Sequence, residues 1–211
     1  MNETLVIWDI EWHYSKFLDV VNLDLFWNKR EVDIILAWDI VWKWPNNIEL
    51  LTHLMNSKNN IQSVLWNKDY LVQQLISGEN MNCNKKWVNS LSSELEKYPK
   101  LQDFFMDLFN PYLEIYEGKF IVTHAHIRWN LDIDQYSKEE LIGIGRTTWK
   151  KFNKKWQILI HWHKPNRVWP QIKYNSKGRI LSIWIDTWAW KGGKLSGVLL
   201  GENKMSFVSS S

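Results

Sequence analysis

The chain has few residues of the kinds that cross-link or punctuate a fold, with one cysteine, five prolines and nine glycines among 211 residues. Because Cys83 is the single cysteine, it can form no internal disulfide and belongs to no metal-binding cysteine pair. No apolar run approaches the roughly 18 residues of a membrane span, and the N-terminal segment does not resemble a signal peptide. We therefore expect a soluble, cytoplasmic protein that does not bind membranes.

An excess of one charge is also absent, since the formal net charge is only +3 and basic residues are spread among nearly as many acids. This balance does not favour nucleic-acid binding, although weak attraction to anions such as phosphate esters is compatible with it. A chain of 211 residues with 45% hydrophobic content can bury one sizeable core. We predict a single domain over residues 1–211, while the oligomeric state is left open.

The chain is rich in tryptophan and poor in glycine. There are 16 Trp and 9 Gly, whereas glycine normally makes up about 7% of a chain.

The order of apolar runs predicts an α/β layer architecture. In the first half, apolar runs that end in polar residues alternate with helical patterns. Ser15 is a candidate N-cap of the first predicted helix. Residues 70–112 predict a helical insertion, and the Ser-rich tail from Ser206 is expected to fray. Four short β-type runs follow the insertion. The predicted strands lie in 4–10, 32–40, 61–70, 119–127, 156–165, 179–188 and 194–201, and the early helices in 15–26 and 46–55.

Chemistry-bearing side chains stand where the predicted strands end. Ligands collect beyond the carboxyl ends of strands in open α/β sheets, so these residues predict a composite metal site. Carboxylate and imidazole ligands suit Mn, Fe or Zn better than Ca. The residues concerned are Asp9, Glu11, Asp39, Asn67, Lys68, His124, His126, His161 and His163.

The stretches "WDIEW", "WDIVWKWP", "WNKD", "THAHI" and "HWHKP", with the late "IDTWAWKGGKLSGVLL", follow one another in a familiar order. In this order the chain resembles the calcineurin-like metallophosphoesterases, whose motifs are GDxHG, GDxVDRG, GNHD or GNHE, an HA or HG step, and GHTP. The resemblance is strongest to the phosphoprotein phosphatase branch, which includes symmetrical diadenosine tetraphosphatases. It implies an α/β fold with a two-sheet β-sandwich flanked by helices, and a substrate that is a phosphoprotein or a small phosphate ester.

The resemblance also implies a site for two divalent metal ions (Mn, Fe or Zn) that hydrolyses phosphate esters. Asp9 would bind the first metal and Asp39 would bridge both. The second metal would be completed by Asn67, His124 and His163. Glu11 stands where the family has His, which changes the charge and metal preference of the first site.

Three catalytic positions depart from the family. Trp42 and Lys68 stand at the family's Asp and His dyad, and Lys43 stands at an Arg that clamps phosphate. A lysine ammonium is a poor proton donor near neutral pH, and Lys43 replaces a bidentate fork with a point charge. Arg146, in "IGIGRTTW", corresponds to a second phosphate-binding Arg of the family.

Seven of the sixteen Trp stand at motif glycines of the family, and His126 falls where a glycine is common. Glycine at such turns allows positive φ or close approach of the backbone to a ligand. We therefore expect the indoles to fill or distort the pocket. The seven are Trp8, Trp12, Trp38, Trp44, Trp66, Trp162 and Trp188.

These observations favour a metal-dependent phosphoesterase whose activity is severely impaired or lost. The alternative is a non-catalytic pseudo-phosphatase scaffold that binds a partner or ligand in its aromatic-filled cleft. A third possibility is that the Gly to Trp changes prevent folding. His161 is expected to be a strand residue or a partner of a metal ligand rather than a ligand. An aromatic platform that stacks a base or sugar is the less favoured explanation of the Trp cluster.

Overall fold

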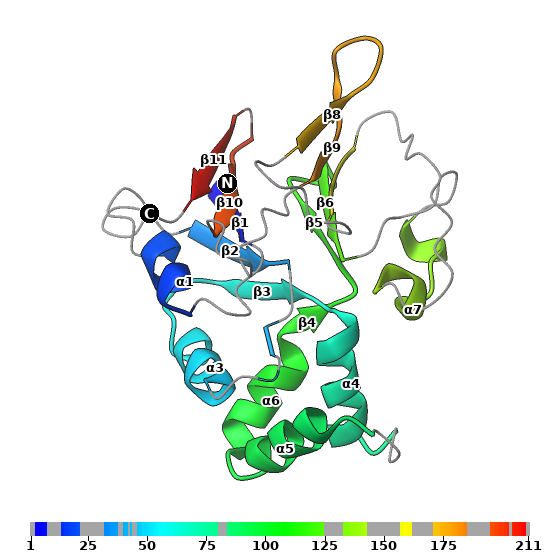
Figure 1. The fold of residues 1–211 in the computed structure, drawn as a ribbon. Helices are drawn as coiled ribbons and strands as arrows, with labels where there is room; N and C mark the ends of the chain where they lie inside the picture. Colours follow the sequence, from blue (N-terminus) through cyan, green and yellow to red (C-terminus); the bar gives the residue numbers. More distant parts are fainter. Residues whose placement is uncertain are drawn as a thin grey trace.

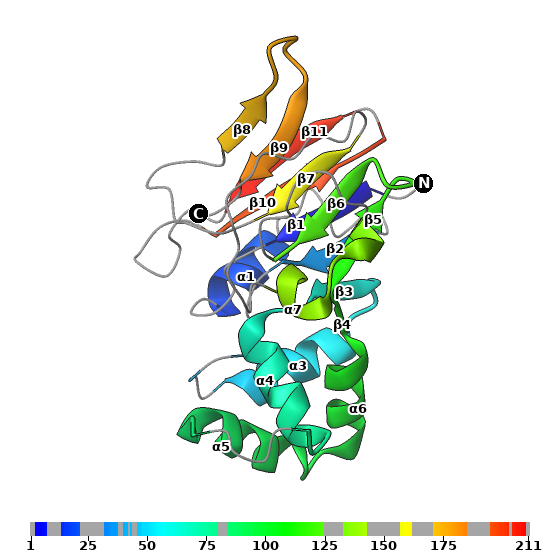
Figure 2. The same cartoon turned by 90° about the vertical axis from the view of Figure 1, so that its right-hand side faces the viewer.

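Short apolar strands build two β-sheets that pack face to face (Figures 1 and 2). The computed structural model describes residues 3–7, 14–21, 32–37, 40–41, 43, 46–79, 84–124, 133–142, 157–161, 171–184, 195–202 and 204–209. The first sheet has the strand order β11-β10-β1-β2-β3-β4. Its strands are β1 (Glu3–Ile7), β2 (Val32–Leu36), β3 (Ile61–Val64), β4 (Phe109–Asn110), β10 (Ser196–Leu200) and β11 (Met205–Ser209).

The second sheet has the order β5-β6-β7-β9-β8. Its strands are β5 (Tyr112–Ile115), β6 (Phe120–Thr123), β7 (Ile158–His161), β8 (Gln171–Tyr174) and β9 (Ile180–Trp184). In each sheet the central pairs are parallel, so that β1, β2 and β3 end at one edge, as do β6, β7 and β9. Two carboxyl-terminal edges are thus available to position a site.

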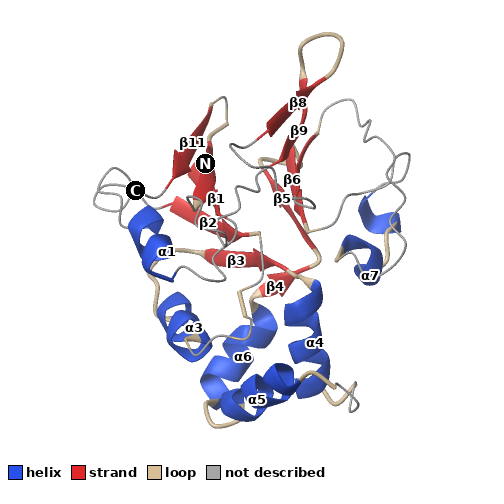
Figure 3. Cartoon of the chain, in the orientation of Figure 1, coloured by secondary structure: helices blue, strands red, loops and turns tan. Residues whose placement is uncertain are grey.

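Helices flank the two sheets (Figure 3). They are α1 (Tyr14–Val21), α3 (Asn47–Met55), α4 (Asn67–Ile76), α5 (Lys86–Leu95), α6 (Pro99–Asp107) and α7 (Lys138–Leu141), with a 3₁₀ turn at Ile133–Gln135. Helices α4, α5 and α6 occupy the range in which the sequence predicts a helical insertion. None of the helices in the described ranges is long and apolar enough to cross a membrane.

The strand pleat divides the apolar side chains between separate cores. In β1, Leu5 and Ile7 join the core beneath the helices, whereas Val6 faces the second sheet. In β6, Val122 lies between the sheets and Ile121 packs on the other side with residues around α7. Strands β1, β2, β6 and β7 therefore bury both faces, which explains their continuous apolar sequences.

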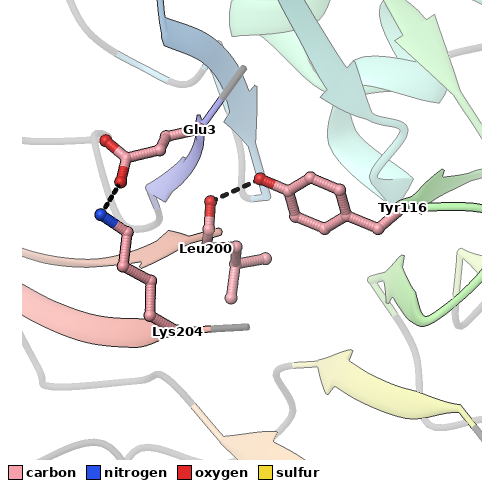
Figure 4. A network of polar contacts seen from close by, with 4 residues as sticks. All are labelled: Glu3, Tyr116, Leu200 and Lys204. Atoms are coloured by element: carbon pink, nitrogen blue, oxygen red, sulfur yellow. Dashed lines mark hydrogen bonds and ion pairs between the residues drawn. The ribbon is translucent and has the colours of Figure 1, made fainter. Parts of the chain in front are cut away.

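The two sheets are tied together at the end opposite to these carboxyl edges (Figure 4). The Tyr116 hydroxyl, in the turn after β5, donates a hydrogen bond of 2.7 Å to the carbonyl oxygen of Leu200 in β10. Burial raises the pKa of Tyr116, which keeps this hydroxyl protonated. Lys204 also forms an ion pair with Glu3, which joins the β10–β11 turn to β1.

Two local expectations are wrong. The segment from Ser206 does not fray, because Met205–Ser209 forms β11 and pairs antiparallel with β10 at the edge of the first sheet. Ser15 is not the N-cap of the first helix, since α1 already begins at Tyr14. Strands β5 and β8 are also missing from the sequence prediction, because each is short and β8 carries mostly exposed residues.

Candidate metal and phosphate site

The described part of the site is built where β3 passes into α4 (Figure 1). Trp66 occupies the N-cap position and Asn67 is the first residue of the helix. Trp66 has an extended backbone, with φ −115° and ψ 166°. At this position the chain therefore needs no positive φ, and the glycine of the family is not required for backbone conformation.

Trp66 and His124 bring the ends of two strands from different sheets together. Their ring centroids are 4.4 Å apart with an interplanar angle of 70°, an edge-to-face contact. Only 6% of Trp66 and 4% of His124 is exposed. Because Asn67 follows Trp66 directly, this contact places two of the expected ligands, Asn67 and His124, at the same junction.

The Trp66 indole belongs to the core between the sheets, where it packs with Ala37, Val64 and Ile160. At this position the tryptophan therefore packs mainly in the core, whereas the sequence predicts that the motif tryptophans fill the pocket. Trp66 is accommodated mainly by the inter-sheet core, and it meets the predicted site through the edge contact with His124. The other six motif tryptophans and Trp42 lie outside the described residues.

Lys68 lies above the Trp66 ring, with Nζ 4.4 Å from the ring centroid. This cation–π geometry stabilises the charged ammonium. A half-buried cation beside Asn67 can attract phosphate. The geometry is consistent with an electrostatic role for Lys68.

Asp69 is a residue of the site that sequence analysis missed. Its side chain is fully buried in the first turn of α4, and Oδ1 accepts a hydrogen bond of 3.3 Å from the backbone N–H of Val41. Val41 lies in the loop after β2, two residues beyond Asp39. Asp69 thus links the loop that carries a predicted bridging ligand to the helix that carries Asn67. Asp69 ends the stretch "WNKD", as an acid ends the motifs GNHD and GNHE, but the sequence does not show that its side chain is buried.

His161 ends β7, but the pleat separates it from His124. Ile160 faces the inter-sheet core and Leu159 faces the α7 side, so alternation places His161 on the α7 side. This placement agrees with the expectation that His161 is a strand residue. His163 and His126 lie outside the described residues.

Helix α7 is held against α4 beside the site. The Tyr70 hydroxyl donates a hydrogen bond of 3.3 Å to Glu139, and the Lys138 ammonium lies 4.6 Å from the Tyr70 ring centroid. Burial and the nearby Glu139 carboxylate raise the pKa of Tyr70. The pKa of Glu139 is lowered, chiefly by a hydrogen bond from its own backbone N–H. These contacts join α7 to α4.

The described donors fit one part of a transition-metal site. The amide oxygen of Asn67 and the buried imidazole of His124 are suitable ligands for Mn, Fe or Zn. Within the described ranges, no three His, Cys, Asp or Glu side chains form a metal-binding group. The remaining predicted ligands and phosphate-binding residues lie outside those ranges; they are Asp9, Glu11, Asp39, His163 and Arg146.

The strand orders and the helical layers form a mixed α/β fold of two sheets flanked by helices, which matches the fold of solved metallophosphoesterase structures. Neither a protein-family model nor a curated protein sequence matches the chain. Its fold is similar to that of a candidate diadenosine tetraphosphatase, with TM-score 0.67 and 17% identity over 100% of this chain and 94% of the other.

Two further crystal structures share the fold at 15% identity and cover 100% of this chain and 88% of their own. One is a hypothetical protein of Pyrococcus horikoshii OT3, with TM-score 0.56. The other is a metallophosphoesterase of Sphaerobacter thermophilus, with TM-score 0.55. The fold expected from the order of the motifs is confirmed.

Proposed function

We propose that the chain keeps the framework of a metal-dependent phosphoesterase, and that its hydrolysis of phosphate esters is severely reduced because residues at the catalytic positions differ from those of the family. The observation that carries the proposal is the junction of Asn67 and His124 through the Trp66 contact at the carboxyl ends of β3 and β6. Strand ends that meet in this way are the usual place for ligands in α/β folds.

Bound divalent metal ions would neutralise charge on the phosphate and lower the pKa of a water molecule. Asn67 and His124 would contribute an amide oxygen and an imidazole nitrogen to them, together with Asp9, Asp39 and His163. Glu11 is proposed to replace the missing imidazole of the first metal.

The side chains around phosphate have binding roles in this proposal. Lys68 and Lys43 supply positive charge, and Arg146 adds a guanidinium that can form two parallel hydrogen bonds to phosphate. Lysine and arginine are in general poor proton donors near neutral pH. Substrate binding is therefore expected to survive better than protonation of the leaving group.

A second candidate function is a non-catalytic scaffold that binds a partner or ligand. The packing of Trp66 in the inter-sheet core favours the scaffold, because this tryptophan contributes to the core and does not clash with the surrounding structure. The fold could then persist without turnover.

Hydrolysis of p-nitrophenyl phosphate with Mn²⁺, measured beside metal content, tests the proposal. We expect slow turnover that disappears on chelation and in His124→Gln, since this change removes a ligand. His53→Gln is the control, because His53 packs against Tyr14 and Phe17 on the helical side. Stoichiometric metal with no turnover would favour the scaffold, and fast turnover would show that the catalytic departures are harmless.

A further inference from the structure

A basic pocket lies where the loop after β2 meets the start of α5. It has a volume of about 540 Å³ and is lined by Lys43, Lys85, Lys86 and Trp87. The three lysines are exposed, and Trp87 is half-buried with part of its ring packed against the helical core. No acidic side chain is found among the described residues that line it. The pocket therefore combines concentrated positive charge with one apolar wall.

The hydrogen bond between Asp69 and Val41 connects this pocket to the predicted site. Lys43 is two residues beyond Val41, so their Cα atoms are at most about 7 Å apart. Val41 is in turn bound to the first turn of α4, where Asn67 and Lys68 begin the helix. The same short loop thus reaches from the predicted ligands to the lysines of α5.

The charges suit an anion and the indole suits an organic group beside it. Lysine ammonium groups bind phosphate as point charges, and several around one pocket favour a ligand with more than one negative charge. The half-buried Trp87 offers a flat apolar surface with little loss of side-chain freedom.

We propose that Lys85, Lys86 and Trp87, which share a pocket with Lys43, form a subsite for a phosphate group other than the one attacked, and that the ligand is a small organic phosphate with at least two phosphate groups. Its place beside a reacting phosphate rests on the proposed function. Anion binding in the pocket does not, because the lysines and the cavity are present whether or not hydrolysis occurs.

Calorimetric titration of the full chain with inorganic tripolyphosphate and with orthophosphate tests the subsite. The buffer contains a chelator, so that metal sites make no contribution, and its ionic strength is fixed because salt screens exposed charges. We expect tripolyphosphate to bind at least about tenfold more tightly than orthophosphate. The double variant Lys85→Gln/Lys86→Gln is expected to lose about tenfold in tripolyphosphate affinity.

The matched control is Lys97→Gln/Lys100→Gln, which removes the same net charge at exposed positions outside the pocket. Retained affinity in this control, with loss in the pocket variant, supports the subsite. Equal loss in both variants, or equal binding of the two probes to the unmodified chain, would overturn it. Absence of hydrolysis together with specific tripolyphosphate binding would reject the proposed function and leave the subsite standing.

Discussion

A chain in which the catalytic departures are reversed is expected to hydrolyse p-nitrophenyl phosphate at least about 100-fold faster than the unmodified chain with Mn²⁺ present. The substitutions are Glu11→His, Trp42→Asp, Lys43→Arg and Lys68→His, with glycine at the seven motif tryptophans. The measurement is kcat/KM beside bound metal.

Each polar substitution restores a particular function. Lys68→His replaces an ammonium held over an indole ring with a group that titrates near neutral pH, and Trp42→Asp supplies an acid to orient it. General acid catalysis of this kind contributes roughly 10²- to 10⁴-fold. Lys43→Arg restores a planar fork for phosphate, and Glu11→His restores the imidazole at the first metal.

An intermediate chain with only the four polar substitutions separates chemistry from sterics. Replacement of Trp66 by glycine removes a side chain from the inter-sheet core, and truncation of a buried Trp costs about 3–5 kcal/mol. Thermal unfolding therefore accompanies every activity measurement. Full recovery in the intermediate chain would show that the indoles do not obstruct the site, and no recovery in either folded chain would refute the account of the catalytic positions.

Asp69→Ala is expected to lower the free energy of unfolding by about 2 kcal/mol. The substitution removes a buried acceptor from the N–H of Val41 and leaves a cavity at a fully buried position. It also releases the loop after β2 from α4. We therefore expect weaker Mn²⁺ binding together with the loss of stability, measured by urea unfolding and metal titration.

Asp69→Asn is the matched control, because it keeps the shape and one acceptor oxygen of the side chain. It is expected to retain more than half of the stability that Asp69→Ala loses. If both variants unfold and bind Mn²⁺ like the unmodified chain, the bond between Asp69 and Val41 has no positioning role.

Much of the fold is predictable from the sequence because parallel strands with two buried faces leave continuous apolar runs. The runs around β1, β2, β6 and β7 are of this kind, and each overlaps the strand that it predicts. The sequence analysis misses strand β11 because an edge strand pairs with a single neighbouring strand and its side chains are mostly exposed or half-buried. Its Ser-rich composition resembles a fraying end.

The candidate site is only partly predictable, for a different reason. The order of the motifs identifies Asn67 and His124, since each follows an apolar run directly. The burial of Asp69 and the direction of the Trp66 ring depend on how β3, the loop after β2 and the second sheet pack together. No local pattern encodes these contacts.

The most direct measurement of the central claim, that the strand ends carry an inherited metal site, is nuclear magnetic resonance of ¹⁵N-labelled histidine rings during titration with Zn²⁺. Signals of His124 and His53 are assigned from His124→Gln and His53→Gln. The account predicts that a ring nitrogen of His124 shifts and saturates at a stoichiometric amount of Zn²⁺, while His53 beside Tyr14 and Phe17 does not change. An unchanged His124, or a His53 response of equal size, would contradict it.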